Sequence, residues 1–340
     1  MAQAYMTETG SGGSGPERPK SRLRSMFTGW RNDRGIWRRG LVMAALAILL
    51  TLVMLLHGRI PNSVGNLGSL LETFMPWFGL LIPVLLVGGF LRKSATALIA
   101  LILPLVIWLN LFGGLITDKS GGKGDLTVAT HNVNAENSDP AGTARELAAS
   151  GAQIVALEEL TARAVPEYEK ALAGAYRYHA VRGTVGLWSK YPLTSTKTVD
   201  LKLGWVRAMR STVLTPHGDV GVYVAHLPSV RVKVDAGFTA GQRDTSAQAL
   251  GTAIRLEKLK EVVLLGDLNG TMNDRSLSPV TAQMRSTQGA AGDGFGFSWP
   301  AAFPMARIDQ IMIRGVQPVS SWTLGETGSD HLPIAASLRL

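Results

Sequence analysis

Cysteine is absent from this chain of 340 residues. The protein therefore has no disulfide bonds and no metal site built from thiolates. An oxidising environment outside the cell is compatible with this composition but is not required by it.

Charged residues are absent from three long apolar stretches, at residues 40–56, 74–91 and 94–117. Each stretch approaches or exceeds the ~20 residues that an α-helix needs to cross the hydrocarbon core of a bilayer. A cleaved signal peptide is the alternative for the first stretch, but its basic leader is too long and two further apolar stretches follow. The sequence therefore predicts a three-helix transmembrane domain over residues 36–117.

Positive charge is concentrated before the first stretch, where residues 1–40 hold eight Lys or Arg against three Asp or Glu. Arg92 and Lys93 lie between the second and third stretches, whereas the segment between the first and second, residues 57–73, holds Arg59 as its one Lys or Arg. Because Lys and Arg mark the cytoplasmic side, we expect a cytoplasmic N-terminus and an extracytoplasmic segment after residue 117, in the plasma membrane. Residues 1–35, rich in Gly, Ser, Pro and Arg, are expected to form a disordered basic tail. Residues 118–124 are expected to be a flexible linker spanning about 15 Å.

Residues 125–340 lack a clear excess of positive or negative charge, because they hold 21 Lys or Arg against 20 Asp or Glu. The formal charge of +9 for the whole chain thus arises mostly outside this segment. A face that binds duplex DNA is expected to be clearly basic, because much of its affinity comes from neutralised phosphates. We therefore expect no nucleic-acid partner.

Short apolar runs alternate with amphipathic segments from residue 125 onward. Many strands with few helices, in a segment long enough to bury a core, favour an α/β fold of packed sheets flanked by helices. Helices are predicted at residues 141–150, 165–173 and 246–259. Strands are predicted at residues 126–130, 154–157, 184–188, 211–214, 220–225, 262–265, 308–313 and 334–338.

Polar side chains follow several of these runs, at points where a strand gives way to a turn. In VVLLGDLNGT at residues 262–271, Asp267 and Asn269 emerge directly after a buried strand. An Asx turn is the purely structural alternative for this pair. Side chains at strand ends can reach a ligand while their backbone stays fixed, so these clusters are candidate site residues. Similar clusters occur at residues 130–134, 157–159, 225–228, 307–309 and 329–331.

Seven segments in order resemble the endonuclease/exonuclease/phosphatase superfamily. The resemblance covers residues 125–340 and implies a four-layer α-β-β-α sandwich, with a divalent metal ion at the edge of the sheets and hydrolysis of a phosphoester or phosphoanhydride. The segments are Asn132-Val133, IVALEE at 154–159, WSKYP at 188–192, VAHLP at 224–228, GDLNG at 266–270, RIDQI at 307–311 and SDHLP at 329–333.

Residues 60–77 and 294–311 resemble the VanJ- and StaP-type membrane proteins linked to teicoplanin resistance. This narrower resemblance implies an extracytoplasmic phosphatase acting on undecaprenyl pyrophosphate, the lipid carrier of cell-wall synthesis.

The resemblance assigns the metal ligands by register. Glu159 is the expected ligand of Mg²⁺, or of Mn²⁺ in its place. Asn132 and Asp330 are expected to complete the coordination shell of the ion. The superfamily usually has Gln before this Glu, whereas the chain has Glu158. Asn134 stands where some nuclease members carry a carboxylate, which leaves the second ligand open.

The resemblance also assigns catalytic roles. Asp267 orients or deprotonates the attacking water and Asn269 holds water or a phosphate oxygen. Asp309 fixes the tautomer of His331, whose cationic ring stabilises charge on the attacked phosphoryl group.

Three further residues are candidate phosphate contacts. His226 is expected to touch phosphate or the leaving oxygen, with a buried core histidine as the alternative. Arg231 and Arg243 are candidates for the distal phosphate, with ordinary surface arginines as the alternative.

These patterns favour a membrane-tethered, Mg²⁺-dependent phosphatase that hydrolyses a lipid pyrophosphate. A membrane-anchored extracellular nuclease of the same fold is the main rival. A protein that binds lipid or antibiotic without turnover is a third interpretation.

Overall fold

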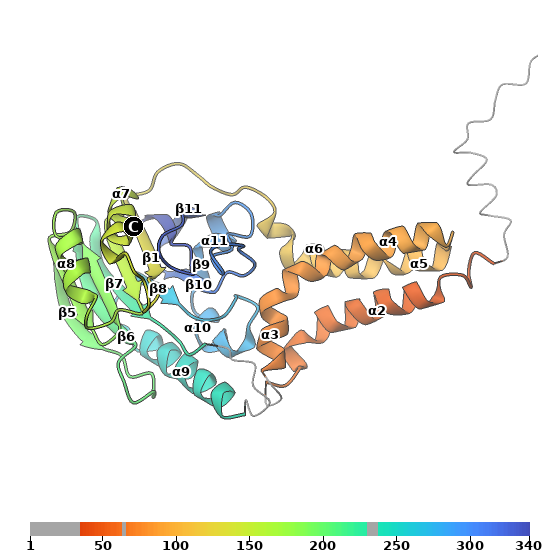
Figure 1. Cartoon of the computed structure of the whole chain (residues 1–340), viewed down its shortest axis with the longest axis horizontal. Coiled ribbons are helices and arrows are strands. Elements are labelled where there is room, and N and C mark those ends of the chain that lie inside the picture. The colour runs from red at the N-terminus through yellow and green to blue at the C-terminus, as the bar shows by residue number, and fades with distance from the viewer. Residues whose placement is uncertain (1–34, 63–65, 230–236) are drawn as a thin grey trace, which may run out of the picture.

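The structure is a computed structural model that describes residues 35–62, 66–229 and 237–340. A rod of helices precedes a rounded α/β domain (Figure 1). The predicted disorder of residues 1–35 concerns a segment that, apart from Gly35, lies outside the described residues. Arg231 also lies outside them.

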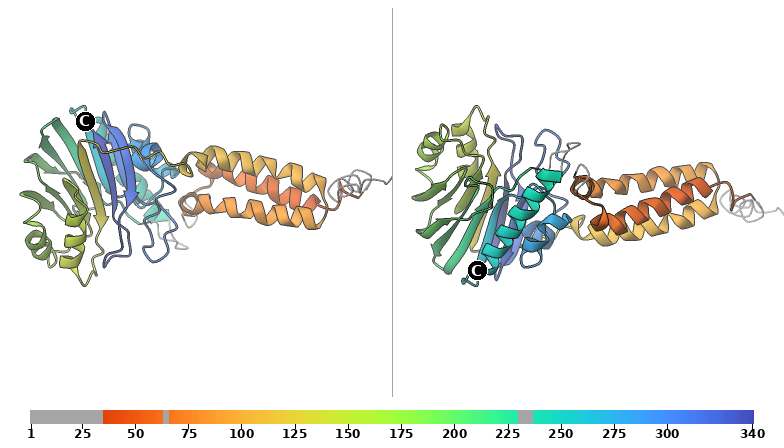
Figure 2. Two further views of the ribbon diagram at one scale, coloured as in Figure 1. Left: turned by 90° about the horizontal axis from the view of Figure 1, so that it is seen from above. Right: turned by 90° about the horizontal axis from the view of Figure 1, so that it is seen from below.

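The rod consists of three long helices that are apolar enough to cross a membrane: Leu41–Arg59, Leu67–Leu91 and Ala95–Leu115. Figure 2 shows these helices running side by side. Their parts are α2 (Leu41–Leu56), η1 (His57–Arg59), α3 (Leu67–Phe74), η2 (Met75–Leu80), α4 (Leu81–Leu91), α5 (Ala95–Ala100), α6 (Ile102–Phe112) and η3 (Gly113–Leu115). The second helix begins seven residues before the apolar stretch read from the sequence. Its first part, α3, contains polar residues that interrupt the apolar pattern, and their side chains are buried against the neighbouring domain: Ser69 Oγ donates to Asp274, and the carboxylate of Glu72 accepts from the backbone of Arg275.

Two six-stranded mixed sheets form the centre of the domain among the described residues. The first has the order β11-β12-β1-β2-β4-β3, with bounds β1 Leu126–Asn132, β2 Ile154–Glu158, β3 Tyr178–Arg182, β4 Val185–Ser189, β11 Gln317–Thr323 and β12 Ile334–Arg339. The second has the order β5-β6-β7-β8-β10-β9, with bounds β5 Leu193–Thr198, β6 Ala208–Thr215, β7 Gly218–Ala225, β8 Val262–Asp267, β9 Arg285–Ser286 and β10 Asp309–Arg314. Only β1 with β2 and β7 with β8 pair in parallel in this part of the chain.

The sheets pack face to face over aliphatic side chains such as Val128, Ile154, Val222 and Ile311. Helices α7 (Pro140–Ala149) and α8 (Val165–Leu172) cover the outer face of the first sheet. Helices α9 (Gly237–Arg255) and α10 (Ser278–Thr281) cover the second sheet, as Figure 2 shows for α9, and α11 (Thr287–Ala291) lies against β10 and β11. This arrangement confirms the predicted four-layer α-β-β-α sandwich preceded by three apolar helices.

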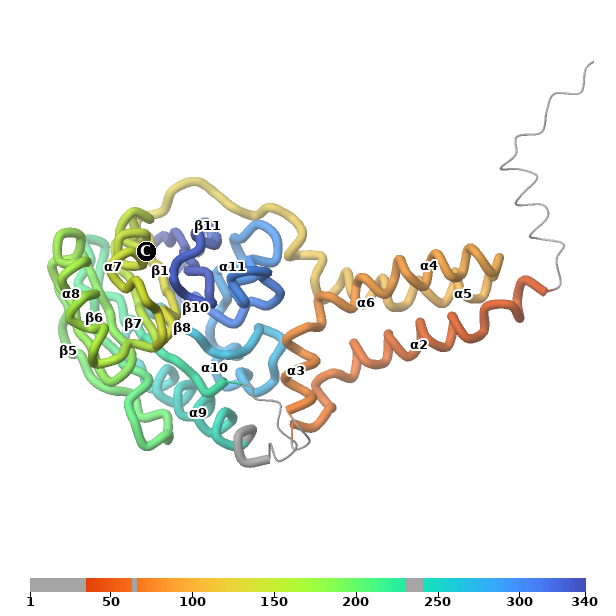
Figure 3. Tube along the Cα trace, viewed as in Figure 1, coloured from red at the N-terminus to blue at the C-terminus, as the bar shows by residue number. Residues whose placement is uncertain are grey.

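The segment at residues 118–124 passes over the outside of the domain before entering β1 (Figure 3). The amide of Lys119 donates to the carbonyl of Gly292 at 3.2 Å, and the amide of Gly121 donates to the carbonyl of Val319 at 2.6 Å. The segment therefore lies along α11 and β11 rather than projecting freely into solvent.

Aromatic side chains join the helical rod to the domain. The indole of Trp77 stacks on Phe297 and Phe303, with ring centroids 5.8 and 6.4 Å apart, and donates to the carbonyl of Met305 at 2.8 Å. Phe295 packs against Trp108, 6.3 Å between centroids. Tryptophan suits this junction because its ring is apolar while its N–H requires a polar partner.

Candidate active site

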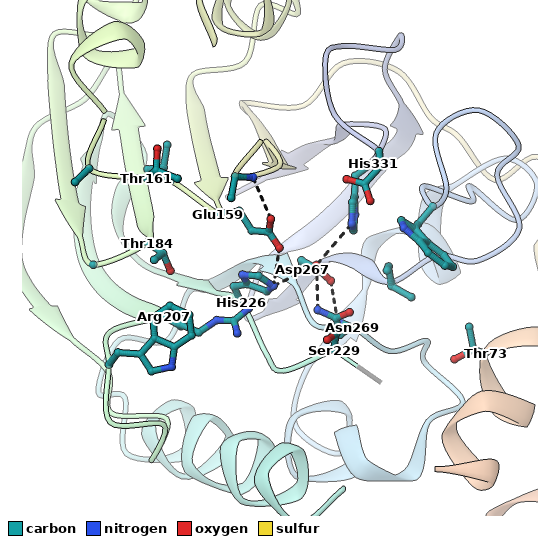
Figure 4. Close-up of a pocket in the computed structure, with 18 of the residues that line it drawn as sticks. Thr73, Glu159, Thr161, Thr184, Arg207, His226, Ser229, Asp267, Asn269 and His331 are labelled. Carbon is teal, nitrogen blue, oxygen red and sulfur yellow. Dashed lines mark hydrogen bonds and ion pairs between the residues drawn. The ribbon is translucent and has the colours of Figure 1, made fainter. Parts of the chain in front are cut away.

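The predicted site residues converge at one edge of the two sheets. Asn132, Glu158 and Asp267 end β1, β2 and β8, His226 follows β7, and Asp309 begins β10. The neighbouring strands β7 and β8 approach so closely here that a Cβ on Gly266, whose φ is +145°, would lie 1.9 Å from the carbonyl oxygen of Ala225. Figure 4 shows the side chains of Glu159, His226, Asp267, Asn269 and His331 facing one another across this edge.

Asp309 and His331 form a tight buried pair. Nδ1 of His331 lies 2.9 and 3.1 Å from the two carboxylate oxygens of Asp309, and the hydroxyl of Ser298 donates to Asp309 at 2.6 Å. Burial alone would lower the pKa of His331, but the charge and hydrogen bond of Asp309 raise it to about 10. Burial alone would raise the pKa of Asp309, but the charge of His331 holds it below its usual value. The ring of His331 is therefore cationic at neutral pH, with Nε2 facing Asp267 at 3.9 Å.

Asp267 is the centre of the site. Its Oδ2 accepts from the amide groups of Asn132 at 3.0 Å and Asn269 at 3.1 Å, and its Oδ1 accepts from the backbone N–H of Asn269 at 2.8 Å. Burial, followed by the charge of Asp309, raises the pKa of Asp267 to about 7. A carboxylate with a pKa near neutrality is suited to accept a proton from water. The Asx-turn contact to the backbone of Asn269 is present as well, so this local turn and the site geometry coexist.

His226 lies between two carboxylates. Its Nε2 is 3.6 Å from both Glu159 Oε1 and Asp267 Oδ2. Burial, followed by the nearby charge of Arg207, lowers the pKa of His226 well below its usual value. The residue is buried, as a core histidine would be, but its ring also lines the site pocket. It is therefore a neutral ring available to contact a substrate oxygen.

Three non-glycine residues at this edge adopt the left-handed backbone region: Glu159 with φ of 60°, Asn134 with φ of 61° and Asn269 with φ of 48°. Such conformations are costly for residues with a Cβ, and they cluster at functional sites where the surroundings enforce them. The backbone of Ala135 donates to Glu159 Oε2 at 3.2 Å and holds the carboxylate at the pocket.

The donor set fits a hard divalent cation. Glu159 and Asp330 both line the pocket with carboxylate oxygens, which Mg²⁺ and Mn²⁺ prefer. Asn132, the third predicted ligand, is buried and contacts Asp267 and the backbone of Asn134. Asp330 also accepts from the side chain of Asn134 at 3.1 Å.

Glu158 points between the sheets rather than into solvent. Its Oε1 accepts from Thr130 at 2.8 Å, and its Oε2 is buried without a hydrogen-bond partner. Burial raises the pKa of Glu158 well above its usual value, and the charges of Asp309 and Asp267 add to this effect. The site thus concentrates more carboxylates than its cations balance, an arrangement that a bound divalent cation would compensate.

A second grouping, Asp267, Asp309 and His331, also brings potential metal ligands within 4.8 Å of one another. The histidine of this group is engaged by Asp309 and cationic, whereas a metal ligand must be a neutral imidazole. Glu159 with Asp330 is therefore the better candidate for the cation. Such an ion would neutralise non-bridging phosphate oxygens.

A pocket of about 820 Å³ contains these groups. Two of its walls were not predicted from the sequence. Trp205 and Arg207, in the loop between β5 and β6, form one wall, with the guanidinium 5.1 Å from the indole centroid. Leu70, Thr73 and Phe74 of α3 form another, so the end of a helix long and apolar enough to cross a membrane belongs to the pocket.

The side chain of Arg243, a candidate contact of the distal phosphate in the sequence, points to other protein groups. It is buried, its Nη1 lies 2.7 Å from Asp274 Oδ2, and its Nη2 donates to the carbonyl of Asn269 at 2.8 Å. Arg243 is not among the residues that line the pocket. Arg207, which follows no recognisable motif, is the described arginine that does line it.

Residues 129–331 match the model of the endonuclease/exonuclease/phosphatase family. The chain belongs to this family. Family members are metal-dependent hydrolases, either phosphatases or nucleases. A search of curated proteins finds no match.

Solved structures of this family are similar in fold. They include mannosyl-6-phosphatase from Bacteroides thetaiotaomicron, with a TM-score of 0.54, 16% identity and coverage of 63% of this chain and 99% of that one. The endonuclease/exonuclease/phosphatase from Bacteroides vulgatus has a TM-score of 0.54 and 18% identity, and the match covers 64% of this chain and 100% of that one. D. rerio TDP2 complexed with a single-strand DNA product has a TM-score of 0.53 and 18% identity, and the match covers 63% and 99%. At these identities the similarity establishes the fold, while substrate must be argued from the site.

Proposed function

We propose that this family member is a membrane-anchored, Mg²⁺-dependent phosphatase that hydrolyses a lipid pyrophosphate, with undecaprenyl pyrophosphate as the expected substrate. One observation carries the proposal: the pocket that contains Asp267, His226 and His331 is also lined by α3, the end of an apolar helix of membrane-spanning length. A substrate held in both regions has a phosphate group and an apolar chain.

The proposed reaction transfers the terminal phosphoryl group to water. Asp267 accepts a proton as the water oxygen bonds to phosphorus, and Asn269 orients the water through its amide. The bridging P–O bond breaks, which yields inorganic phosphate and the lipid monophosphate. Cationic His331 stabilises the charge that grows on the phosphoryl oxygens, and the guanidinium of Arg207 is placed to hold the other phosphate.

The distribution of Lys and Arg supports an extracytoplasmic orientation for the domain, because Arg92 and Lys93 and the N-terminal segment hold most of the charge near the apolar helices. In that orientation the proposed role is to recycle the lipid carrier of cell-wall synthesis, with a link to glycopeptide (teicoplanin) resistance. Protease protection of intact cells tests the orientation, and a protected C-terminal domain would contradict it.

A nuclease of the same fold is favoured by one observation. Trp205 is 58% exposed beside the pocket and stacks with Arg207, an arrangement that suits a nucleobase. The near balance of charge over residues 125–340 favours the lipid substrate instead.

The deciding experiment measures phosphate release by the purified full chain in detergent micelles with Mg²⁺. We expect release from undecaprenyl pyrophosphate by the wild type and none by Asp267→Ala. Degradation of single-stranded DNA without release from the lipid would establish the rival. Lipid affinity without turnover, unchanged by Glu159→Gln and independent of metal, would indicate a binding protein.

A further inference from the structure

The loop after β8 carries Asn269 and returns along the face of the membrane helix. The side-chain amide of Asn269 donates to Asp267 and, at 3.0 Å, to the carbonyl of Leu227. Because both contacts come from one amide group, a displacement of the loop backbone moves Asn269 away from the carboxylate that it orients.

Arg243 of α9 fastens both ends of this loop. It donates from Nη2 to the carbonyl of Asn269 at 2.8 Å and pairs through Nη1 with Asp274 at 2.7 Å. The guanidinium lies directly on the loop, since a Cβ on Gly270 would lie 2.1 Å from Nη2. The side chains of Arg243 and Asp274 are 4% and 0% exposed, so the pair is shielded from water.

The third partner of this ion pair belongs to the membrane helix. Nη1 of Arg243 donates to Ser69 Oγ of α3 at 3.0 Å, and Ser69 Oγ donates to Asp274 Oδ1 at 3.3 Å. Glu72 of α3 accepts two more hydrogen bonds from the same loop. The hydroxyl of Thr271 donates to the backbone carbonyl of Glu72 at 3.3 Å, and the backbone N–H of Arg275 donates to the carboxylate of Glu72 at 3.2 Å. The loop that positions Asn269 is therefore held from both sides, by α9 and by α3.

We infer that Arg243 is a positioning residue that couples the catalytic loop to the membrane helix, so that the rate of hydrolysis depends on how α3 is docked. The inference rests on the proposed hydrolytic role of this site but not on the identity of the lipid. It also explains why a buried ion pair is placed here, where a hydrophobic contact would hold the helix but would not fix the carbonyl of Asn269.

The test uses the full chain in detergent micelles with undecaprenyl pyrophosphate and Mg²⁺. Arg243→Met is expected to lower kcat by at least about tenfold while KM changes by less than about twofold, because the substrate contacts remain. Ser69→Ala is expected to lower kcat by a smaller factor, and Arg243→Lys to recover part of the loss. The double variant should be no slower than Arg243→Met alone, since both changes break one network.

A matched control is present on the outer face of the second sheet. Arg210 pairs with Glu257 at 2.7 Å, with the two side chains 8% and 7% exposed, and its remaining bond goes to Thr212. Neither partner lines the catalytic pocket. Arg210→Met should lower thermal stability without changing kcat, and an equal kcat effect in Arg210→Met and Arg243→Met would overturn the inference.

Hydrogen exchange of residues 268–276 provides a readout that needs no substrate. Ser69→Ala and Arg243→Met should both accelerate exchange in this loop, whereas Arg210→Met should not. If the wild type releases no phosphate from the lipid, the proposed function fails while this measurement still decides the coupling. If Arg243→Met does not fold, Ser69→Ala decides it, and unchanged exchange in the Ser69 variant would refute the inference.

Discussion

Replacing Asp309 by Asn tests whether a cationic His331 is required for catalysis. Asp309 accounts for the largest favourable contribution to the raised pKa of His331, which lies at about 10. At pH 8 a histidine with that pKa is roughly 99% protonated, whereas one returned to its ordinary value of about 6.5 is roughly 3% protonated. Asp309→Asn should therefore reduce kcat/KM at pH 8 by about 30-fold or more, because burial without the carboxylate lowers the pKa of His331 further.

The pH profile of kcat/KM between pH 5 and 10 is the informative assay. The wild type should gain activity as pH rises through about 7, where Asp267 loses its proton, and keep it until the pH approaches 10. Asp309→Asn should lose activity several pH units below that alkaline limit. The raised pKa of His331 also stabilises the folded protein at low pH. Its contribution to the free energy of unfolding is complete below the unfolded pKa of about 6.5 and is lost as pH rises through the folded pKa of about 10.

An exposed pair elsewhere provides the control for this experiment. His179 Nε2 lies 3.2 Å from Glu169 Oε1, with side chains 42% and 39% exposed. Glu169→Gln removes a similar carboxylate from a histidine and should leave the profile unchanged. If Asp309→Asn retains both the rate and the alkaline limb of the wild type, the cationic role of His331 is refuted.

Three further outcomes follow from the structure. Phe74→Ala removes part of the pocket wall that α3 provides. It should raise KM for a long-chain lipid pyrophosphate about 5- to 30-fold, from roughly 1–2 kcal/mol of lost apolar contact, while KM for inorganic pyrophosphate is unaffected. Leu256→Ala, at an exposed apolar residue outside the pocket, is the control, and equal effects would contradict the assignment. Gly266→Ala forces a Cβ against the backbone of β7 and should lower the free energy of unfolding by about 3 kcal/mol or more, as measured by thermal melting. Gly204→Ala is the control and should lower it by roughly 1 kcal/mol, because Gly204 has φ of 80° but open space around it. Glu159→Gln should raise the Mg²⁺ concentration for half-maximal activity by at least about tenfold, and a chelator should abolish wild-type turnover; an unchanged Mg²⁺ titration would remove Glu159 from the metal site.

The central strands could be predicted from the sequence, but the edge strands could not. The four missed strands β3, β5, β9 and β11 are the edges of the two sheets. Each edge strand has one unpaired side, and at least half of its residues are exposed or only half-buried, as in LTSTKT of β5. None therefore contains the continuous apolar run that marks a central strand.

Site residues on strand ends were predictable for a related reason. Asp267 ends β8, Asp309 begins β10 and His331 lies three residues before β12. Buried strands therefore fix the backbone beside all three residues, and the structure brings their side chains together. Arg207 and Phe74 reach the pocket only through tertiary packing of a loop and a helix, which no local pattern encodes. The partner of Arg243 is equally invisible in the sequence, because Ser69 lies 174 residues away.

The helix Leu67–Leu91 has 25 residues and is therefore about 37 Å long, roughly 7 Å more than a hydrocarbon core of about 30 Å. If its α4 end meets one boundary of that core, the surplus at the α3 end stands among the lipid headgroups, at the depth where phosphates reside. A lipid anchored in that leaflet would then present its phosphates to the catalytic carboxylates without being extracted, and turnover would depend on lateral diffusion within the bilayer instead of on solubility in water.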